Sequence, residues 1–260
     1  MLVGRRHRTP VVVTEQSSNF PLRVLSRTEV VAARLAFRGA ARVMPVSRSL
    51  QRAIEAYGIR ARFRVVPNAV DPSIFHPGEG AAPAGRLLCV ALLRPVKCVD
   101  DLLHALADPA LSRDDWHLDV VGDGPHRAVC ERLADRLGLR PRVTFHGYQP
   151  KATVADFMRR SDALVLPSRS ENMPCVALEA LTTGLPVIAT KVGGVPEIVD
   201  DASGVLAPPG DAAALARAVT HFLDHRDEFD RASIARQATE RFSLQTVGAA
   251  LGDVYREVLA

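Results

Sequence analysis

The sequence is poor in the residues that build covalent or metal cross-links. Its 260 residues include four cysteines, which form no CxxC pair and no cysteine–histidine spacing typical of a metal site. We interpret them as reduced thiols of a cytosolic protein with buried apolar roles. The eight histidines form no HExxH pattern, and neither GxSxG nor a P-loop motif occurs. We therefore predict no bound metal and no catalytic histidine, and nothing supports a serine hydrolase or a P-loop enzyme.

Long apolar runs are also missing. None approaches the roughly 18 residues that a membrane-spanning helix needs. The start MLVGRRHRTP has no apolar stretch of the kind found in a secretory signal. Aromatic residues make up 5% of the chain, whereas apolar residues as a whole make up 47%. Such a chain can bury a core of small aliphatic side chains, which suits helices packed on a buried sheet.

Lysine and acidic residues are scarce at the start of the chain. Residues 1–64 contain 13 Arg, no Lys and three acids, a net charge of +10. The remaining 20 bases and 26 acids give −6, in agreement with the +4 of the whole chain. A basic segment joined to an acidic one indicates contact with an anionic surface or ligand. Membrane headgroups and a merely solvated arginine face both fit, and no nucleic-acid-binding module is present.

Short aliphatic runs alternate with helical patterns over most of the chain. The runs predict strands at Leu87–Ala91, His117–Val121, Val143–His146, Ala163–Leu166, Val187–Thr190 and Gly204–Leu206. Helical spacing predicts helices at about 99–107, 125–137, 153–160 and 174–183, a further one N-capped by Asp211, and more to the end. Six strands separated by helices indicate an α/β fold with a doubly wound parallel sheet. Such a sheet binds ligands at the carboxyl ends of its strands.

The first part of the chain carries a shorter version of this pattern. Val11–Thr14 and Val43–Val46 are predicted strands, and helical spacing between Ser26 and Gly58 predicts two helices, the later one N-capped by Ser47. A Pro/Gly/Ala-rich stretch then marks a linker. We expect three parts, which are residues 1–66, 67–241 and a final helical segment at 242–260.

Two carboxylates eight residues apart carry the strongest functional signal, in the stretch ENMPCVALEA. Pro174 favours the start of a helix, which puts Glu171 just before the helix and Glu179 near its second turn. Backbone N–H groups of the first turn would then point toward whatever Glu171 holds. These groups belong to Asn172, Met173 and Cys175. Carboxylates beside backbone donors suit a polyhydroxylated ligand such as a sugar, although the spacing alone fits a solvated helix equally well.

Two glycine-containing turns follow other strands. VVGDGP places Gly122 and Gly124 in a tight turn, with Asp123 able to accept from hydroxyls; an ordinary turn between strand and helix explains it as well. HGYQP places Tyr148 at another strand end, where the ring either packs on a base or lies on the surface.

Features that suit a phosphate occur at two further strand ends. VALLRPVK sets Arg94 and Lys97 before a helix, where both could neutralise a diphosphate. GGVPE places Gly193 and Gly194 after a strand, so that the backbone can approach a phosphate closely. A structural turn fits the local sequence of GGVPE equally well.

These motifs occur in a characteristic order: VPNAVDPSIFHP, VVGDGP, VTFHGY, the paired glutamates, GLPVIAT and GGVPE. In this order they closely resemble the family 4 retaining glycosyltransferases, which have the GT-B fold of two Rossmann-like domains. The resemblance extends from about Val11 to the end of the chain. It implies transfer of a sugar from a nucleotide-diphospho-sugar, such as a UDP- or GDP-sugar, to a hydroxyl of a glycan, lipid or small molecule, without metal or cofactor.

The resemblance also implies roles for individual residues. Lys97, Arg94 and Glu171 would be catalytic. The donor would be held by Gly122, Asp123, Tyr148, Ser168, Asn172, Met173, Pro174, Cys175, Glu179, Gly193 and Gly194.

The sequence departs from the family pattern around the phosphates and the sugar. The family's Gly-Arg-Leu is ALL here, with Leu92 in place of the arginine. Arg94 lies two residues on, and alternate side chains of an extended strand share a face, so Arg94 is the expected substitute. The family's Lys-Gly is Lys97-Cys98, and its EGFG is ENMP. The last change alters the surroundings of the sugar hydroxyls.

Only the last part of the family's N-terminal, acceptor-binding domain has a counterpart, in residues 1 to about 64, where TEQSSNF resembles a segment found well inside that domain. A fragment, a misassigned start and a partner chain each explain this. Two alternatives to an active transferase stay open. One is a non-catalytic nucleotide-sugar-binding fragment or subunit that needs a partner, and the other is a sugar-nucleotide 2-epimerase of the same fold, whose motif order fits less well.

Overall fold

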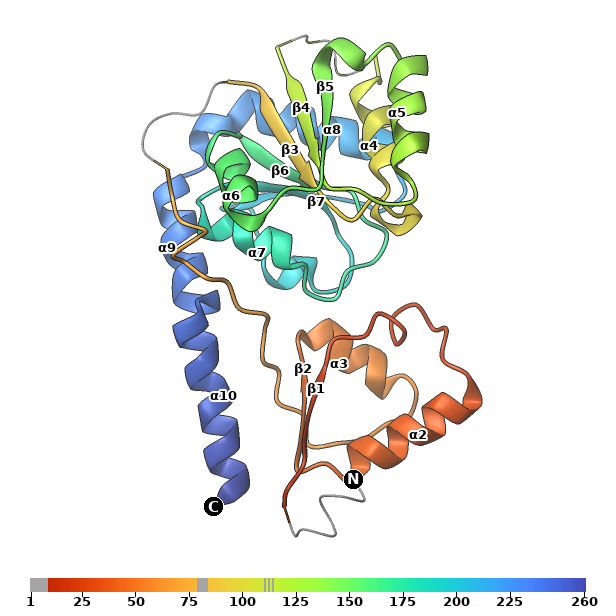
Figure 1. Ribbon diagram of the computed structural model, residues 1–260, viewed down its shortest axis with the longest axis vertical. Helices are drawn as coiled ribbons and strands as arrows, with labels where there is room; N and C mark the ends of the chain where they lie inside the picture. The colour runs from red at the N-terminus through yellow and green to blue at the C-terminus, as the bar shows by residue number, and fades with distance from the viewer. Residues whose placement is uncertain (1–8, 79–83, 110, 112, 114) are drawn as a thin grey trace.

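Two parallel sheets form the framework of the protein. The computed structural model describes residues 9–78, 84–109, 111, 113 and 115–260. Within them a six-stranded sheet has the strand order β5-β4-β3-β6-β7-β8, and a two-stranded sheet pairs β1 with β2. Figure 1 shows the six-stranded sheet and its helices as a larger unit, with the two-stranded sheet in a smaller unit below it.

The larger sheet confirms the predicted doubly wound α/β architecture. All its neighbouring strands are parallel, and the chain builds outward from β3 to β5 before returning to the other side of β3. The strands are β3 (Arg86–Val90), β4 (His117–Val121), β5 (Val143–Gly147), β6 (Ala163–Leu166), β7 (Val187–Thr190) and β8 (Gly204–Ala207). Each boundary lies within one residue of its prediction. The strand order reverses between β3 and β6, which is where such sheets bind ligands.

Helices cover both faces of this sheet. One face carries α4 (Val99–Leu106), α5 (Arg127–Arg136) and α8 (Ala212–His225). The other carries α6 (Lys151–Arg159), α7 (Cys175–Thr182) and α9 (Arg231–Phe242). Successive strand residues pack into opposite cores, as Leu87 and Leu88 do, because side chains alternate across a strand. Short 3₁₀ turns lie at η1 (Pro95–Lys97), η2 (Arg140–Arg142), η3 (Val195–Glu197) and η4 (Arg226–Glu228).

Helix starts follow local capping chemistry. Asp211 and Ser47 are N-caps as predicted; their side chains accept from Ala214 N at 2.8 Å and from Leu50 N at 3.0 Å. The prediction for α5 is wrong by two residues, because the residues before Arg127 still belong to the glycine turn.

The smaller unit has a β-α-β-α order. β1 (Val12–Glu15) and β2 (Arg42–Pro45) are parallel, with α2 (Arg27–Arg38) between them and α3 (Arg48–Glu55) after them. Both strands lie one residue from their predicted positions. The side chain of Ser26 starts α2 in a capping box with Glu29.

The chain crosses between the units at two neighbouring positions. The first crossing passes Val70 and the second passes Ser243. The two segments are hydrogen-bonded to each other, since Val70 N donates to Phe242 O at 2.8 Å and Leu244 N donates to Val70 O at 2.9 Å. The units are therefore joined along one paired segment.

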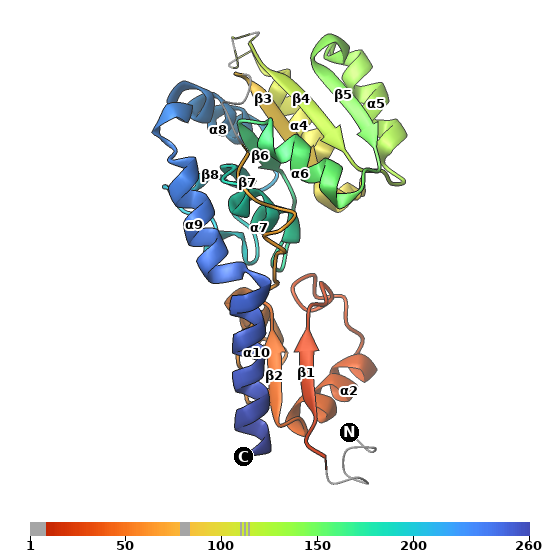
Figure 2. The same ribbon diagram turned by 60° about the vertical axis from the view of Figure 1, so that its left-hand side comes forward.

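The last helix returns to the smaller unit. α10 (Leu244–Leu259) lies along β2 in Figure 2. Its buried side chains Val247 and Val254 pack with Met44 and Val66, on the sheet face opposite α2 and α3. Arg42 of β2 and Glu257 of α10 also form an ion pair. The smaller sheet is thus covered on both faces.

Three of the four cysteines are buried as predicted. Burial raises the pKa of Cys89 to about 12 and that of Cys130 to about 11, so both are protonated thiols near neutral pH. The prediction of a buried role is wrong for Cys175, which is exposed at the start of α7. In the described part of the chain no helix is both long and apolar enough to cross a bilayer. Nor do the described histidines, cysteines and carboxylates gather in a group of three that could hold a metal ion.

Candidate functional site

A cavity of about 730 Å³ lies at the carboxyl ends of the larger sheet and faces the smaller unit. The ends of β3, β4 and β5, the loop after β6 and the start of α7 line it, together with residues that follow β1 and β2. The position is the one predicted from the parallel strands. The volume is typical of a pocket for a small organic ligand.

Lys97 and Glu171 form an ion pair in this cavity. Nζ and Oε1 lie 2.6 Å apart, and the two side chains are 26% and 9% exposed. The turn η1 places Lys97, and the loop after β6 places Glu171. Arg169 N donates to Val96 O at 2.9 Å and so holds these two segments together. The pair offers a cation for an anionic group and further carboxylate lone pairs for hydroxyl donors.

The start of α7 lies beside this pair. Pro174 is the N-cap, with φ −69°, and the helix begins at Cys175, close to the prediction. The first N–H groups of the helix have no acceptor within it. Glu179 follows in the second turn and lines the cavity. Burial raises the pKa of Glu179, and the nearby ammonium of Lys151 opposes that shift.

The VVGDGP turn packs closely against the segment after β3. Gly122 has φ +125°, and a Cβ there would lie 1.9 Å from Ala91 O. The carboxylate of Asp123 accepts from Gly124 N at 2.7 Å and from Arg127 at 3.2 Å. Both glycines line the cavity. Glycine is required at these positions because a side chain would collide with the backbone of the segment after β3.

The GGVPE turn packs in the same way against the loop between β6 and α7, residues 167–174, which carries Glu171 and is called the acidic loop below. Gly193 has φ +51°, and a Cβ there would lie 1.6 Å from Glu171 O. A Cβ on Gly194 would lie 2.0 Å from Asn172 O. The close approach that the two glycines permit in this structure is to the backbone of the acidic loop.

Most of the residues predicted for the site lie together. Those that line the cavity are Lys97, Gly122, Asp123, Tyr148, Glu171, Asn172, Met173, Pro174, Cys175 and Glu179. Tyr148 is 80% exposed at its edge.

Four predicted residues do not line the cavity. Gly193 and Gly194 lie behind the acidic loop. Ser168 is fully buried, and its carbonyl accepts from the hydroxyl of Thr190. Arg94 is exposed at the N-cap of η1. The role of Arg94 stays a prediction: β3 ends at Val90, and Leu92 lines the cavity whereas Arg94 does not.

Leu92 itself lines the cavity, and Lys97 is the single cation among the described lining residues. Asp123, Glu171 and Glu179 provide three carboxylates. The position that carries an arginine in the family pattern is therefore apolar at the cavity wall.

Sequence reasoning missed the contribution of the smaller unit. The lining residues from this unit and the linker are Gln16, Ser18, Val46 and Asn68, and Gln149 and Val176 were also missed in the larger unit. Gln16 and Ser18 follow β1 directly, so the rule that ligands meet the carboxyl ends of parallel strands, applied to the first predicted strand, would have found them.

Family models match both parts of the chain. The model described as Glycosyl transferases group 1 matches residues 82–241, more than half of the chain. The model described as Glycosyltransferase Family 4 matches residues 1–74.

Curated relatives are about twice as long as this chain. A D-inositol 3-phosphate glycosyltransferase of Acidothermus cellulolyticus is 34% identical over 92% of this chain and 56% of its own length. An alpha-D-kanosaminyltransferase of Streptomyces kanamyceticus is 31% identical over 66% of this chain and 45% of its own length. The chain thus spans about half the length of the curated relatives it matches.

Solved structures share the fold. HepE from Anabaena in complex with UDP has a TM-score of 0.88 and 25% identity, over 98% of this chain and 74% of HepE. Sucrose-phosphate synthase from Thermosynechococcus elongatus has a TM-score of 0.86 and 24% identity, over 99% of this chain and 71% of that structure. The arrangement of the two units is the expected GT-B fold.

The contact between Gly193 and the acidic loop makes a prediction about stability. Gly193→Ala would place Cβ against a backbone carbonyl, so we expect the free energy of unfolding to fall by about 3 kcal/mol or more. Gly210→Ala is the matched control, because Gly210 also has positive φ, +74°, but has no atom within 4 Å of the added Cβ. It should cost only about 1–2 kcal/mol of backbone strain. Urea unfolding followed by circular dichroism measures both, and equal losses would contradict the close contact.

Proposed function

Because the chain belongs to the family 4, group 1 glycosyltransferases of the GT-B fold, we propose that it moves a sugar from a nucleotide-diphospho-sugar to an acceptor hydroxyl with retention of configuration. The observation that carries this proposal is the Lys97–Glu171 pair in a cavity at the strand ends, next to Glu179 and the start of α7. Residues 67–241 would be the donor-binding part, with residues 1–66 and the final segment forming part of the acceptor side.

The proposed roles follow from the charges of the reaction. Departure of a nucleoside diphosphate develops negative charge, which the ammonium of Lys97 stabilises without a metal, with Arg94 as the proposed second cation. Glu171 and the amides at the start of α7 accept and donate hydrogen bonds with the sugar hydroxyls. Glu179 holds the ribose hydroxyls. The departing phosphate takes the proton of the acceptor, so that no separate base is required.

The structural relatives support a nucleotide donor. HepE was crystallised with UDP and with UDP-glucose. We propose a UDP- or GDP-sugar for this chain as well, and we propose that Tyr148 and Gln149, which line the cavity, contact its base.

Donor binding is tested by calorimetry with UDP, GDP and ADP in the presence of a chelator. We expect one of them to bind without metal, and Lys97→Ala to weaken it by about 1.5–3 kcal/mol, the range for a hydrogen bond to a charged group. Arg136→Ala is the control, since Arg136 is exposed at the far end of α5 from the cavity. Binding of none of the three would end the proposal.

The same assay tests whether Arg94 replaces the arginine that the family pattern has at the position of Leu92. If Arg94 reaches the phosphates, Arg94→Ala loses as much affinity as Lys97→Ala. Unchanged nucleotide affinity in Arg94→Ala would show that Arg94 is a surface charge without contact to the phosphates. Leu92→Arg restores the family's cation at the cavity wall and should tighten diphosphate binding by about tenfold.

Two other functions stay as alternatives. The first is a nucleotide-sugar-binding fragment or subunit that needs a partner, and the observation that favours it is the shortness of the chain relative to its relatives. The second is a sugar-nucleotide 2-epimerase of the same fold, which would act on the donor without any acceptor.

Turnover distinguishes these functions. We expect the 260 residues alone to transfer little sugar, because positioning of the acceptor against the donor carbon supplies several kcal/mol of rate acceleration. Extension of the coding sequence upstream, in one chain or by co-expression, should restore transfer to lipid, glycan or small-molecule acceptors. Full turnover by the 260-residue chain would overturn this expectation, and epimerisation of a free donor would favour the second alternative.

We also propose that the enzyme is cytoplasmic and makes peripheral contact with anionic membranes, through α2 and residues 22–26. Exposed arginines occur there, at Arg23, Arg27, Arg34 and Arg38. The same segment has the exposed apolar side chains Leu22, Val24, Val31 and Leu35. Such a surface inserts apolar groups and attracts anionic headgroups.

Co-sedimentation with vesicles tests this contact. Vesicles with phosphatidylglycerol should retain the chain, and phosphatidylcholine vesicles should retain less. The double change Val31→Ser and Leu35→Ser should weaken retention tenfold or more, given about 1.5–3 kcal/mol for each buried side chain. Leu259→Ser, equally exposed on α10 at 73%, is the control. Equal retention by both kinds of vesicle would contradict the proposal.

A further inference from the structure

A carboxylate of the larger unit occupies the N-terminus of a helix in the smaller unit. The Glu197 side chain accepts from Arg48 N at 2.9 Å and from Ser49 N at 2.7 Å. Ser47 accepts from the next two amides of α3, through its hydroxyl at 3.0 Å and its carbonyl at 3.1 Å. The first turn of α3 therefore has all its N–H groups satisfied, half of them from the other unit. A negative charge is favourable at this end of a helix.

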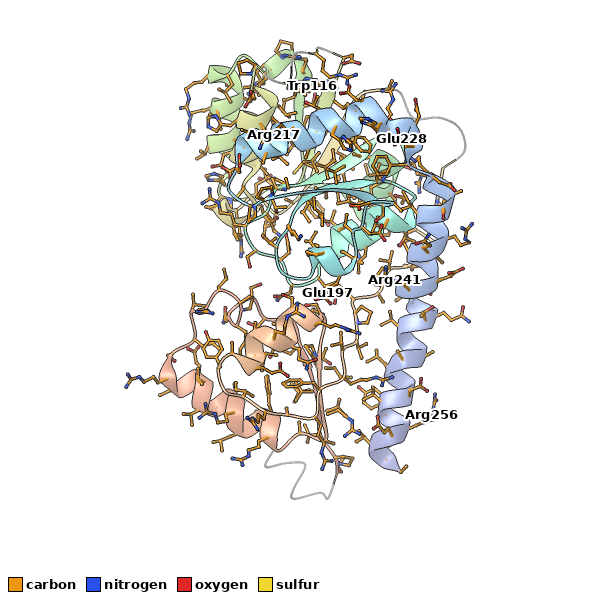
Figure 3. The ribbon with its side chains drawn as sticks, turned by 180° about the vertical axis from the view of Figure 1, so that it is seen from behind. Trp116, Glu197, Arg217, Glu228, Arg241 and Arg256 are labelled. Carbon is orange, nitrogen blue, oxygen red and sulfur yellow. The ribbon has the colours of Figure 1, made fainter. Side chains whose placement is uncertain are left out.

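Glu197 is held for this contact from its own side. It ends η3, and its backbone carbonyl accepts from Arg241 of α9 at 2.9 Å. Figure 3 shows Glu197 between the two units with Arg241 nearby. Glu197 does not line the cavity, so donor binding does not account for its position.

A second side chain crosses between the units at the cavity. Asn172 Nδ2 donates to Gln16 O at 2.7 Å. The family pattern has glycine at this position, and glycine could not make this contact. On the linker, Asn68 Nδ2 donates to Met173 O at 2.8 Å and holds the same loop.

The loops that carry Glu197 and Asn172, the two residues in contact with the smaller unit, pack against each other. Glu197 and Asn172 belong to the two loops that meet through Gly193 and Gly194. A Cβ on Gly194 would also lie 3.0 Å from the Cβ of Ser47, the N-cap of α3. The loop that carries Glu171 therefore touches the smaller unit directly and also through the GGVPE turn.

We propose that Glu197 and Asn172 are positioning residues that hold the smaller unit closed over the cavity. We call the Glu197–α3 and Asn172–Gln16 hydrogen bonds the closing contacts. They fix the distance between the residues after β1 and the Lys97–Glu171 pair. The importance of that distance for sugar transfer rests on the proposed function, whereas the closure itself does not.

Hydrogen exchange measured by mass spectrometry on the full chain without nucleotide tests the closure. Glu197→Ala leaves the amides of Arg48 and Ser49 to water, so exchange of each should rise about five- to tenfold, the effect of the one hydrogen bond that each amide loses. Glu197→Gln retains one acceptor oxygen and should give an intermediate rate. Glu240→Ala is the control, because Glu240 is an exposed carboxylate on α9.

X-ray scattering supplies a second measurement on the same variants. Glu197→Ala should enlarge the radius of gyration, and the double variant with Asn172→Gly should enlarge it further, because two separate contacts are lost. If Glu197 acts only within the larger unit, Glu197→Ala will speed hydrogen exchange only around η3. The exchange of α3 and the radius of gyration will then be unchanged, which would overturn the proposal. Circular dichroism of each variant identifies unfolding, and in that case Glu197→Gln decides.

The outcome is independent of donor chemistry. If no nucleotide binds and the closing contacts are still observed, the proposed function fails alone. If nucleotide binds and Glu197→Ala changes neither exchange nor radius, the closing contacts fail alone.

Discussion

The site depends on the close contact between the backbone of Gly193–Gly194 and the loop at residues 171–172. A side chain at either glycine would meet a carbonyl oxygen at 2.0 Å or less. Because the two loops are in contact, the strand end of β7 supports the loop after β6. That support presents Glu171 to Lys97 on one side and Asn172 to the smaller unit on the other. A single backbone approach therefore positions two neighbouring side chains of one loop, one of which contacts Lys97 and the other the smaller unit.

The charges in the cavity are arranged around Lys97. Lys97 forms an ion pair with Glu171 at 2.6 Å. Burial raises the pKa of Glu179, which lines the same cavity. Under the proposed function, a diphosphate would share Lys97 with Glu171, and hydroxyl groups of the same ligand would donate hydrogen bonds to the Glu171 carboxylate. This exchange favours a ligand that has both an anionic and a hydroxylated part over a simple anion.

The sequence predicts those parts of the structure in which a local pattern of residues corresponds to one kind of structural element. Buried parallel strands are continuous aliphatic runs, and β6 is buried at every position, so its ends were predicted correctly. Lys97 and Glu171 were expected in one site because both follow strands of one sheet and match the family pattern. Arg94 was placed by strand geometry that does not continue beyond β3. The contact to Gln16 left no signal, since its acceptor is a backbone carbonyl 156 residues from Asn172.

The paired crossing at Val70 and Ser243 determines how the two units can move. Two chain segments that are hydrogen-bonded to each other cross at one place, so they resist sliding and separation of the units and leave rotation about a shared axis. Such a crossing can act as a hinge, in which a few residues absorb the φ and ψ changes that rotate one unit relative to the other. Gln16 and Ser18 would then move along an arc toward or away from Glu171, and the cavity would open on the side that faces away from the hinge.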